Sequence, residues 1–138
     1  MKILTVLCQK GGVGKTTFVV NLGKLLSHKG YKTLLIDTDP QGNVSTYLNF
    51  DKNSKAALSA TDLFENRLDK EIMKVSENLY LIPSNKSIIK HSSEKIIGGS
   101  KLIKHKNFLI ENGFDLVLID TPPTISSLTQ ESLTISDY

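Results

Sequence analysis

A glycine-rich loop separates two structured-looking segments near the start of the chain, and it restricts the fold more than any other feature. Residues 9–17 read QKGGVGKTT. The preceding run Ile3–Leu7 is continuous and β-favouring, which is typical of a strand buried on both faces. Residues 15–29 carry apolar side chains at helical spacing, and Gly30 follows as a stop signal. Strand, glycine loop and helix in this order predict a phosphate-binding loop.

The loop residues have the chemistry that phosphate binding requires. Glycines let the backbone approach phosphate oxygens closely, and the N-terminus of the following helix adds its positive end. Lys15 is expected to reach the β- and γ-phosphates, and the hydroxyl of Thr16 to bind Mg²⁺. A dinucleotide-binding G-x-G-x-x-G loop would need glycine where Thr17 stands, so NAD and FAD are not expected. The candidate nucleotide-binding residues of this loop are Gly11, Gly12, Val13, Gly14, Lys15, Thr16 and Thr17.

Further apolar runs predict a parallel sheet. Thr33–Ile36 follows the helix as a second buried strand, and strand, helix and strand form a βαβ unit with a right-handed crossover. Leu79–Ile82 and Leu116–Ile119 predict two more strands. The expected fold is α/β and P-loop NTPase-like, with a mostly parallel sheet flanked by helices on both faces.

The other segments predict helices. Short helices are predicted over residues 60–67 and 70–75, and a last helix over residues 126–135. A lysine-rich helix is predicted over about residues 93–111, with a break near the glycine pair 98–99. No repeat or low-complexity linker divides the chain, so residues 1–138 are expected to form one domain.

The lysine-rich region is interpreted as the solvated face of one or two helices, because apolar residues between the lysines provide a core-facing set. A surface that faces DNA is the alternative. His91 and His105 lie here without acidic or cysteine neighbours at metal-binding spacing, so we expect them at the surface. The lysines concerned are Lys86, Lys90, Lys95, Lys101, Lys104 and Lys106.

Acidic residues follow the ends of the predicted strands. In open α/β sheets ligands bind at the carboxyl edge, so these loops are expected to converge on one site. Asp120 ends an apolar strand, which is the Walker B arrangement for holding Mg²⁺. Asp37 and Asp39 leave the second strand at alternate positions and are expected to project to the same side, where one would orient or deprotonate a water near the γ-phosphate. The alternative is that residues 39–42 merely form a turn.

Composition excludes several classes of protein. Sixteen of the seventeen basic residues are lysine, and Arg67 alone could read guanine bidentately, so sequence-specific DNA recognition is not expected. Non-specific contact with phosphates stays open at a net charge of +3. Cys8 is the single cysteine, which suits a reducing interior. No apolar run has the length of a membrane span or a signal peptide, so a cytoplasmic protein with no membrane partner is expected.

Four motifs occur in a fixed order along the chain: KGGVGKTT, LLIDTDPQGN, LYLIPSN and FDLVLIDTPP. With them the whole chain, Met1 to Tyr138, resembles the ParA/Soj-type partition ATPases. These belong to the deviant-Walker-A P-loop family, which also includes MinD-like proteins and nitrogenase iron protein. The resemblance implies an ATP-driven switch that binds ATP or ADP with Mg²⁺ and acts in plasmid or chromosome segregation.

The resemblance also implies roles for individual residues. Lys10 matches the lysine that reaches across a nucleotide-sandwich homodimer to the phosphates of the partner subunit, and Lys15 matches the lysine that serves its own subunit. Asp39 matches the residue associated with water activation, and Asp120 the Walker B acid. These four are the implied catalytic residues, and Lys10 joins the nucleotide-binding set. The implied metal ligands are Thr16, Asp39 and Asp120.

The implied partners are a ParB-like centromere-binding protein and non-specific DNA, with a cytoplasmic, nucleoid-associated location. Two departures from the family matter: Cys8 replaces a common asparagine, and Tyr138 stands where the next core strand would begin. We therefore expect an incomplete N-terminal part of the ATPase domain, without the DNA-binding half. An exposed edge of the first strand would favour association of such a chain. A MinD-like membrane-cycling ATPase and a non-hydrolysing, truncated nucleotide-binding or interaction module are the alternatives.

Overall fold

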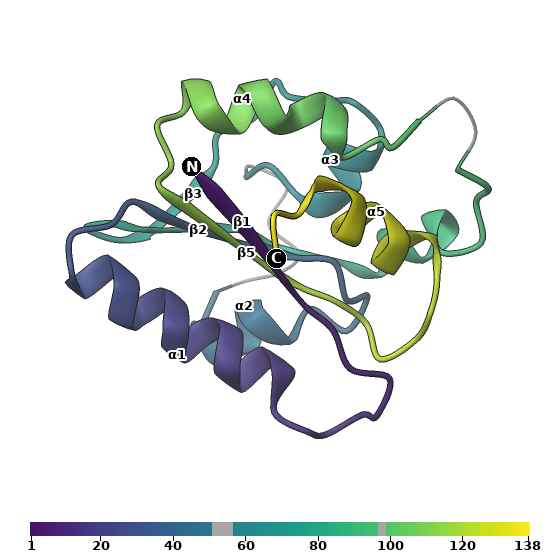
Figure 1. The fold of residues 1–138 in the computed structure, drawn as a ribbon, viewed down its shortest axis with the longest axis horizontal. Helices are drawn as coiled ribbons and strands as arrows, with labels where there is room; N and C mark the ends of the chain where they lie inside the picture. The colour runs from purple at the N-terminus through teal and green to yellow at the C-terminus, as the bar shows by residue number, and fades with distance from the viewer. Residues whose placement is uncertain (51–56, 97–98) are drawn as a thin grey trace.

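A five-stranded sheet lies between two layers of helices in the computed structural model, which describes residues 1–50, 57–96 and 99–138 (Figure 1). The strand order is β1-β5-β2-β4-β3. The β1–β5, β5–β2 and β2–β4 pairs are parallel, and β3 is antiparallel to β4. The predicted α/β fold with a mostly parallel sheet is confirmed. The strands are β1 (Lys2–Val6), β2 (Thr33–Asp37), β3 (Met73–Ser76), β4 (Leu79–Ile82) and β5 (Leu116–Asp120).

Helices cover both faces of the sheet, as predicted. Helices α1 and α2 lie on one face, and α3, α4 and α5 lie on the other (Figure 1). In the part of the chain that the structure describes, no helix has the length and apolar character needed to cross a membrane. The helices are α1 (Lys15–His28), α2 (Asn43–Tyr47), α3 (Ala60–Phe64), α4 (Lys106–Glu111) and α5 (Ser127–Ile135), with 3₁₀ turns η1 (Lys86–His91) and η2 (Ile103–His105).

The central strands have apolar side chains on both faces because helices cover both. All five residues of β2 are buried. Successive side chains of a strand point to opposite faces, so Leu35 packs with Val19 of α1 while Leu34 packs with Leu128 of α5 in a separate cluster. This two-sided burial explains why the strand segments read as continuous apolar runs rather than alternating ones.

The last two residues lie along the outer edge of β1. The amide of Tyr138 donates to the carbonyl of Ile3 at 3.2 Å, and the amide of Thr5 donates to the carbonyl of Tyr138 at 3.0 Å. The carboxylate of Asp137 also accepts from the amide of Ile3 at 2.8 Å. Residues 137–138 therefore pair with the edge of β1 that faces away from β5.

The helix predicted over residues 70–75 is wrong, because residues 73–76 form β3. Their side chains alternate between half-buried and exposed, and a turn at residues 77–78 leads directly into β4. A run of four residues is too short for its apolar spacing to separate a helix from a strand.

The lysine-rich helix predicted over residues 93–111 is confirmed only for its C-terminal part, α4. Residues 93–96 and 99–102 form turns and irregular structure, and the predicted glycine break falls partly on residues 97–98, outside the described residues. Backbone donors of this segment find side-chain partners instead. The amide of Leu102 donates to Glu131 of α5 at 3.1 Å, and the amide of Ile103 donates to the hydroxyl of Ser100 at 3.1 Å.

Both histidines expected at the surface are buried, so that prediction is wrong. His91 is 5% exposed and His105 is 4% exposed. The Nε2 atom of His105 lies 2.8 Å from the carbonyl oxygen of Leu63. The ring of His91 stacks on Phe64 with 5.4 Å between centroids, and its Nδ1 atom lies 2.9 Å from the carboxylate of Glu94. Polar partners nearby make both positions suitable for a buried imidazole.

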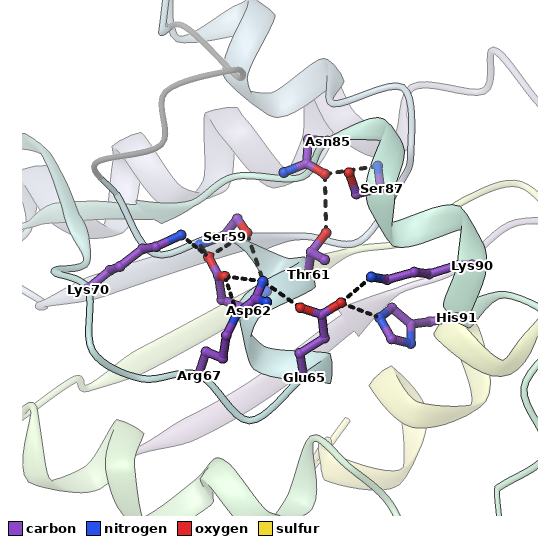
Figure 2. A network of polar contacts seen from close by, with 10 residues as sticks. All are labelled: Ser59, Thr61, Asp62, Glu65, Arg67, Lys70, Asn85, Ser87, Lys90 and His91. Atoms are coloured by element: carbon purple, nitrogen blue, oxygen red, sulfur yellow. Dashed lines mark hydrogen bonds and ion pairs between the residues drawn. The ribbon is translucent and has the colours of Figure 1, made fainter.

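A polar network joins α3 to η1 on this face of the sheet (Figure 2). Ser59 and Asp62 form a capping box at the start of α3. Asp62 also pairs with Arg67 at 2.8 Å and with Lys70 at 3.0 Å. Glu65 pairs with Lys90 of η1 and with Arg67. These charges are satisfied within the network, which lies apart from the cleft described next.

Candidate nucleotide site

Three loops meet at the carboxyl edge of the sheet, around a cleft of about 330 Å³. They are the glycine loop after β1, the loop after β2 and the loop after β5, so the predicted convergence of the three motifs is confirmed. The residues that line the cleft include Gly11, Gly14, Lys15, Thr16, Asp39 and Pro123.

The glycine loop has a backbone that only glycine adopts readily. Gly12 has φ of 71° and Gly14 has φ of 91°, both in the left-handed region. Gly14 is the N-cap of α1, and no side chain of the described residues caps this helix. The first amides of α1 are therefore available to an anion, and the helix dipole favours negative charge there.

Thr16 and Asp120 form the central contact of the site. The hydroxyl of Thr16 donates to Oδ2 of Asp120 at 2.6 Å. Asp120 is 1% exposed. This burial raises the pKa of its carboxyl to about 6, against the opposing hydrogen bond from Thr16 and with a further contribution from the charge of Asp39.

The second carboxylate oxygen of Asp120 matches a metal ligand in character. Oδ1 is buried and has no hydrogen-bond partner among the described residues. An unpartnered oxygen beside a threonine hydroxyl fits a Mg²⁺ ion, which prefers oxygen ligands and keeps several positions for water or phosphate. No group of three or more His, Cys, Asp or Glu side chains in the described ranges could hold a metal unaided. A cation here would thus depend on Thr16, Asp120 and phosphate oxygens.

The sequence predicted that Asp37 and Asp39 project to the same side, and this prediction is wrong. Asp37 is fully buried and turns back toward the following loop, where it accepts hydrogen bonds from the amides of Asp39 and Val44. Burial, and next the charge of Asp120, hold the pKa of Asp37 well above its ordinary value. Asp39 lines the cleft, and its carboxylate accepts from the amide of Gln41 at 2.9 Å.

The turn expected as an alternative at residues 39–42 also exists, since the amide of Gly42 donates to the carbonyl of Asp39 at 2.9 Å. The turn and the cleft position of Asp39 are compatible. The side chains of Asp37 and Asp39 diverge because the backbone leaves the extended conformation immediately after β2.

The two lysines of the loop occupy different environments. Lys15 is half-buried and lines the cleft, together with the neighbouring Thr16 and Thr17. Lys10 and Val13 are exposed to solvent. The lysine predicted to serve its own subunit is therefore at the cleft, whereas Lys10 is exposed and is not among the residues that line the cleft.

Four residues of the cleft wall were not predicted from the sequence. Gln41, Asn43, Tyr47 and Pro123 also line it. The hydroxyl of Tyr47 accepts from the hydroxyl of Thr17 at 3.3 Å, joining α2 to the first turn of α1. Gln41 and Pro123 lie in the loops that follow β2 and β5, which was the available signal, whereas Asn43 and Tyr47 lie in α2, which has only five residues and leaves no periodic pattern.

A profile of the AAA domain family designated AAA_31 matches residues 1–138. The chain belongs to this family. Among AAA-domain relatives, the chromosome-partitioning ATPase Soj of Treponema pallidum is 35% identical over 137 residues, covering 96% of this chain and 53% of Soj. The resemblance to ParA/Soj proteins, which the four motifs indicated, is confirmed.

Solved structures with a similar fold agree with this assignment. Apo McdA of Cyanthece superposes with a TM-score of 0.87 at 30% identity, covering 99% of this chain and 56% of McdA. Cobyrinic acid a,c-diamide synthase of Mycobacterium smegmatis, solved with a bound ATP analogue and magnesium, has a TM-score of 0.85 at 29% identity, with 99% and 57% covered. The chain spans just over half the length of the curated relatives it matches.

Proposed function

We propose that the protein is an ATP-binding, Mg²⁺-dependent ATPase that acts as an ATP-driven dimer switch in plasmid or chromosome partition. The observation that carries the proposal is the contact between Thr16 and Asp120 at the mouth of the glycine loop. It brings together the two side chains through which P-loop NTPases hold magnesium against the β- and γ-phosphates. The partition role is supported by the similarity to Soj of Treponema pallidum, a chromosome-partitioning ATPase.

Each cleft residue has a distinct task in this proposal. The glycine loop and the first turn of α1 bind the phosphates, and Lys15 neutralises their charge. Thr16 and Asp120 hold the magnesium ion, which when bound supplies electrostatic stabilisation of the developing charge on the phosphates. Asp39 would orient the attacking water and accept its proton, and its carboxylate would add a further oxygen ligand to Thr16 and Asp120 for the magnesium ion.

The dimer part of the proposal depends on Lys10. Its exposure gives it access to the nucleotide bound by a second subunit, in the sandwich homodimer that the family resemblance implies. We further propose a ParB-like centromere-binding partner, non-specific DNA as the surface on which the dimer acts, and a nucleoid-associated location in the cytoplasm. In this proposal the described chain is the N-terminal part of a longer ATPase domain.

The roles of the two lysines provide the test. Lys15→Ala removes the cation that faces the phosphates and should abolish binding of a fluorescent ATP analogue. Lys10→Ala should still bind the ATP analogue. Its ATPase rate per molecule should no longer rise with protein concentration, as we expect it to do in the wild type. Lys24→Ala, at an exposed position of α1, controls for the loss of one positive charge. It should change neither nucleotide binding nor hydrolysis.

Equal loss of binding in Lys10→Ala and Lys15→Ala would contradict the role of Lys10 toward a second subunit. Binding of ATP with no turnover at any protein concentration would instead favour a non-hydrolysing nucleotide-binding module.

A further inference from the structure

The carboxylate of Asp37 is fully used within the protein. The residue ends β2 and is 0% exposed. One oxygen accepts from the amide of Asp39 at 2.9 Å, and the other accepts from the amide of Val44 at 3.1 Å. Each oxygen thus has a backbone amide of the following segment as its partner. Asp37 therefore ties two points of the following loop to the end of a central strand.

The second of these bonds replaces a helix cap. Helix α2 begins after Gly42, which is in the left-handed region with φ of 63°, and no side chain next to it caps the helix. The amide of Val44 lies in the first turn, where amides have no partner within the helix. Asp37 provides that partner from the end of β2. The side chain of Val44 is itself 0% exposed and packs in the cluster that includes Val19.

The segment held in this way forms one wall of the phosphate cleft. Asp39 and Gln41 belong to the loop, and Asn43 and Tyr47 belong to α2. The other walls come from the glycine loop and from the loop after β5. Asp37 also lies opposite Asp120 in the β2–β5 register, so the anchor of this wall and the Walker B acid share one position along neighbouring strands.

We propose that Asp37 is a positioning residue, which holds the wall formed by Asp39, Gln41, Asn43 and Tyr47 in place for hydrolysis. It acts through the two amides that it binds, not by contact with the nucleotide. The hydrogen bonds of Asp37 go to the loop after β2 and to α2, not to the glycine loop, which binds the phosphates in the proposed function. Loss of Asp37 therefore lowers turnover and leaves nucleotide capture intact. This inference rests on the proposed ATPase function.

The test compares Asp37→Asn with Asp37→Ala, because the asparagine keeps one acceptor oxygen and the alanine keeps none. A displacement of about 1 Å at a catalytic group can cost on the order of 10²-fold in rate. We expect kcat to fall about tenfold in Asp37→Asn and about 10²-fold in Asp37→Ala. The dissociation constant of an ATP analogue should not change. Hydrogen exchange at the amides of Asp39 and Val44 should accelerate in the same order.

Asp62→Asn is the matched control. Asp62 is a buried aspartate that accepts from the amide of Ser59 at 3.0 Å, in the network of Figure 2. This variant should lose stability in urea without changing kcat. If it reduced kcat as much as Asp37→Asn at equal stability, general destabilisation would explain the result and the positioning role would be wrong.

Two further outcomes separate the inference from the proposed function. Equal inactivity of Asp37→Asn and Asp37→Ala, with unchanged amide exchange, would indicate a direct role of the charge and overturn the inference. A wild-type protein that binds ATP without turnover would contradict the proposed ATPase. In that case the exchange rates at Asp39 and Val44 would still decide if Asp37 holds the wall.

Discussion

The carboxyl group of Asp120 lies where burial and negative charge both oppose its ionisation. Its pKa is about 6, compared with 3.8 for an ordinary aspartate. Between these two pH values the folded protein therefore retains a proton that the unfolded chain releases. A buried acid of this kind stabilises the fold fully only below the pKa of the unfolded chain. The stabilisation is lost as the pH rises through the folded value. A cation that favours the ionised form would oppose this loss.

Replacing Asp120 with asparagine should remove this pH dependence. Between pH 4 and pH 7 the wild-type protein without nucleotide should lose about 2–3 kcal/mol of unfolding free energy relative to Asp120→Asn. Urea denaturation across this range measures the difference. The other carboxyl groups titrate in both proteins, and Asp37, whose pKa the charge of Asp120 helps to raise, changes in the same direction. Parallel stability curves would show that Asp120 ionises normally in the fold.

Asp39 lines the cleft, and its proposed task is to orient the attacking water and accept its proton. Asp39→Ala should bind an ATP analogue normally and hydrolyse ATP about 10²–10⁴-fold more slowly, which is the usual contribution of a positioned base. The nucleotide-bound dimer should then accumulate, as size-exclusion chromatography with ATP would reveal. Normal turnover in this variant would assign water activation to another residue.

At the scale of elements, α1 is held against the sheet at a position without a side chain. Gly23 is buried, and a Cβ atom there would lie 2.6 Å from Cδ2 and 3.4 Å from Cγ of Leu35 in β2. This close approach brings the helix near the strand that carries Asp37. The glycine thus sets the spacing between α1, which begins at the phosphate loop, and the centre of the sheet.

Gly23→Ala should destabilise the protein by about 1–2 kcal/mol. Alanine favours a helix by up to about 1 kcal/mol over glycine, but overpacking a closed core costs about 1–3 kcal/mol. A lower urea midpoint with an unchanged slope would be the expected result. The shorter side chain of Leu35→Val should relieve the clash, so the double variant should be more stable than the sum of the two single effects indicates. Strict additivity would argue against the contact.

The elements that sequence analysis found are those with long or continuous apolar patterns. Four strands and the helix after the glycine loop were predictable because burial on both faces and helical spacing leave clear signals. Helix α2 and strand β3 were not, because five residues leave no helical period in α2 and the side chains of β3 alternate between half-buried and exposed without a continuous apolar run. Asp39 and Asp120 were recognisable from their place after strand ends. The turn of Asp37 toward Val44 depends on the loop path, which no local pattern specifies.

At the scale of the whole molecule, β1 pairs with only β5 among the described strands. Its outer edge is partly covered by residues 137–138 through backbone hydrogen bonds. The amides of Ile3 and Thr5 and the carbonyl of Ile3, which face outward, are paired with these two residues. The exposed edge that the sequence predicted for the first strand is therefore largely closed.

Removing residues 137–138 should uncover this edge and promote self-association of the chain. Sedimentation velocity over a range of concentrations is expected to show a sedimentation coefficient that increases with concentration more strongly for the shortened variant than for the 138-residue chain. Equal concentration dependence of the two proteins would contradict the prediction.

The pairing of β1 with β5 also has a consequence for the time at which the site forms during synthesis. Lys2 lies opposite Leu116 in the register, so the partner of the first strand is made near the end of the described chain. At about 5–20 residues per second, the ribosome needs on the order of ten seconds to produce it. The phosphate loop is thus translated well before the strand that holds β1 in place. Pauses in translation before β5 would prolong the exposure of an apolar strand to chaperones and to other nascent chains.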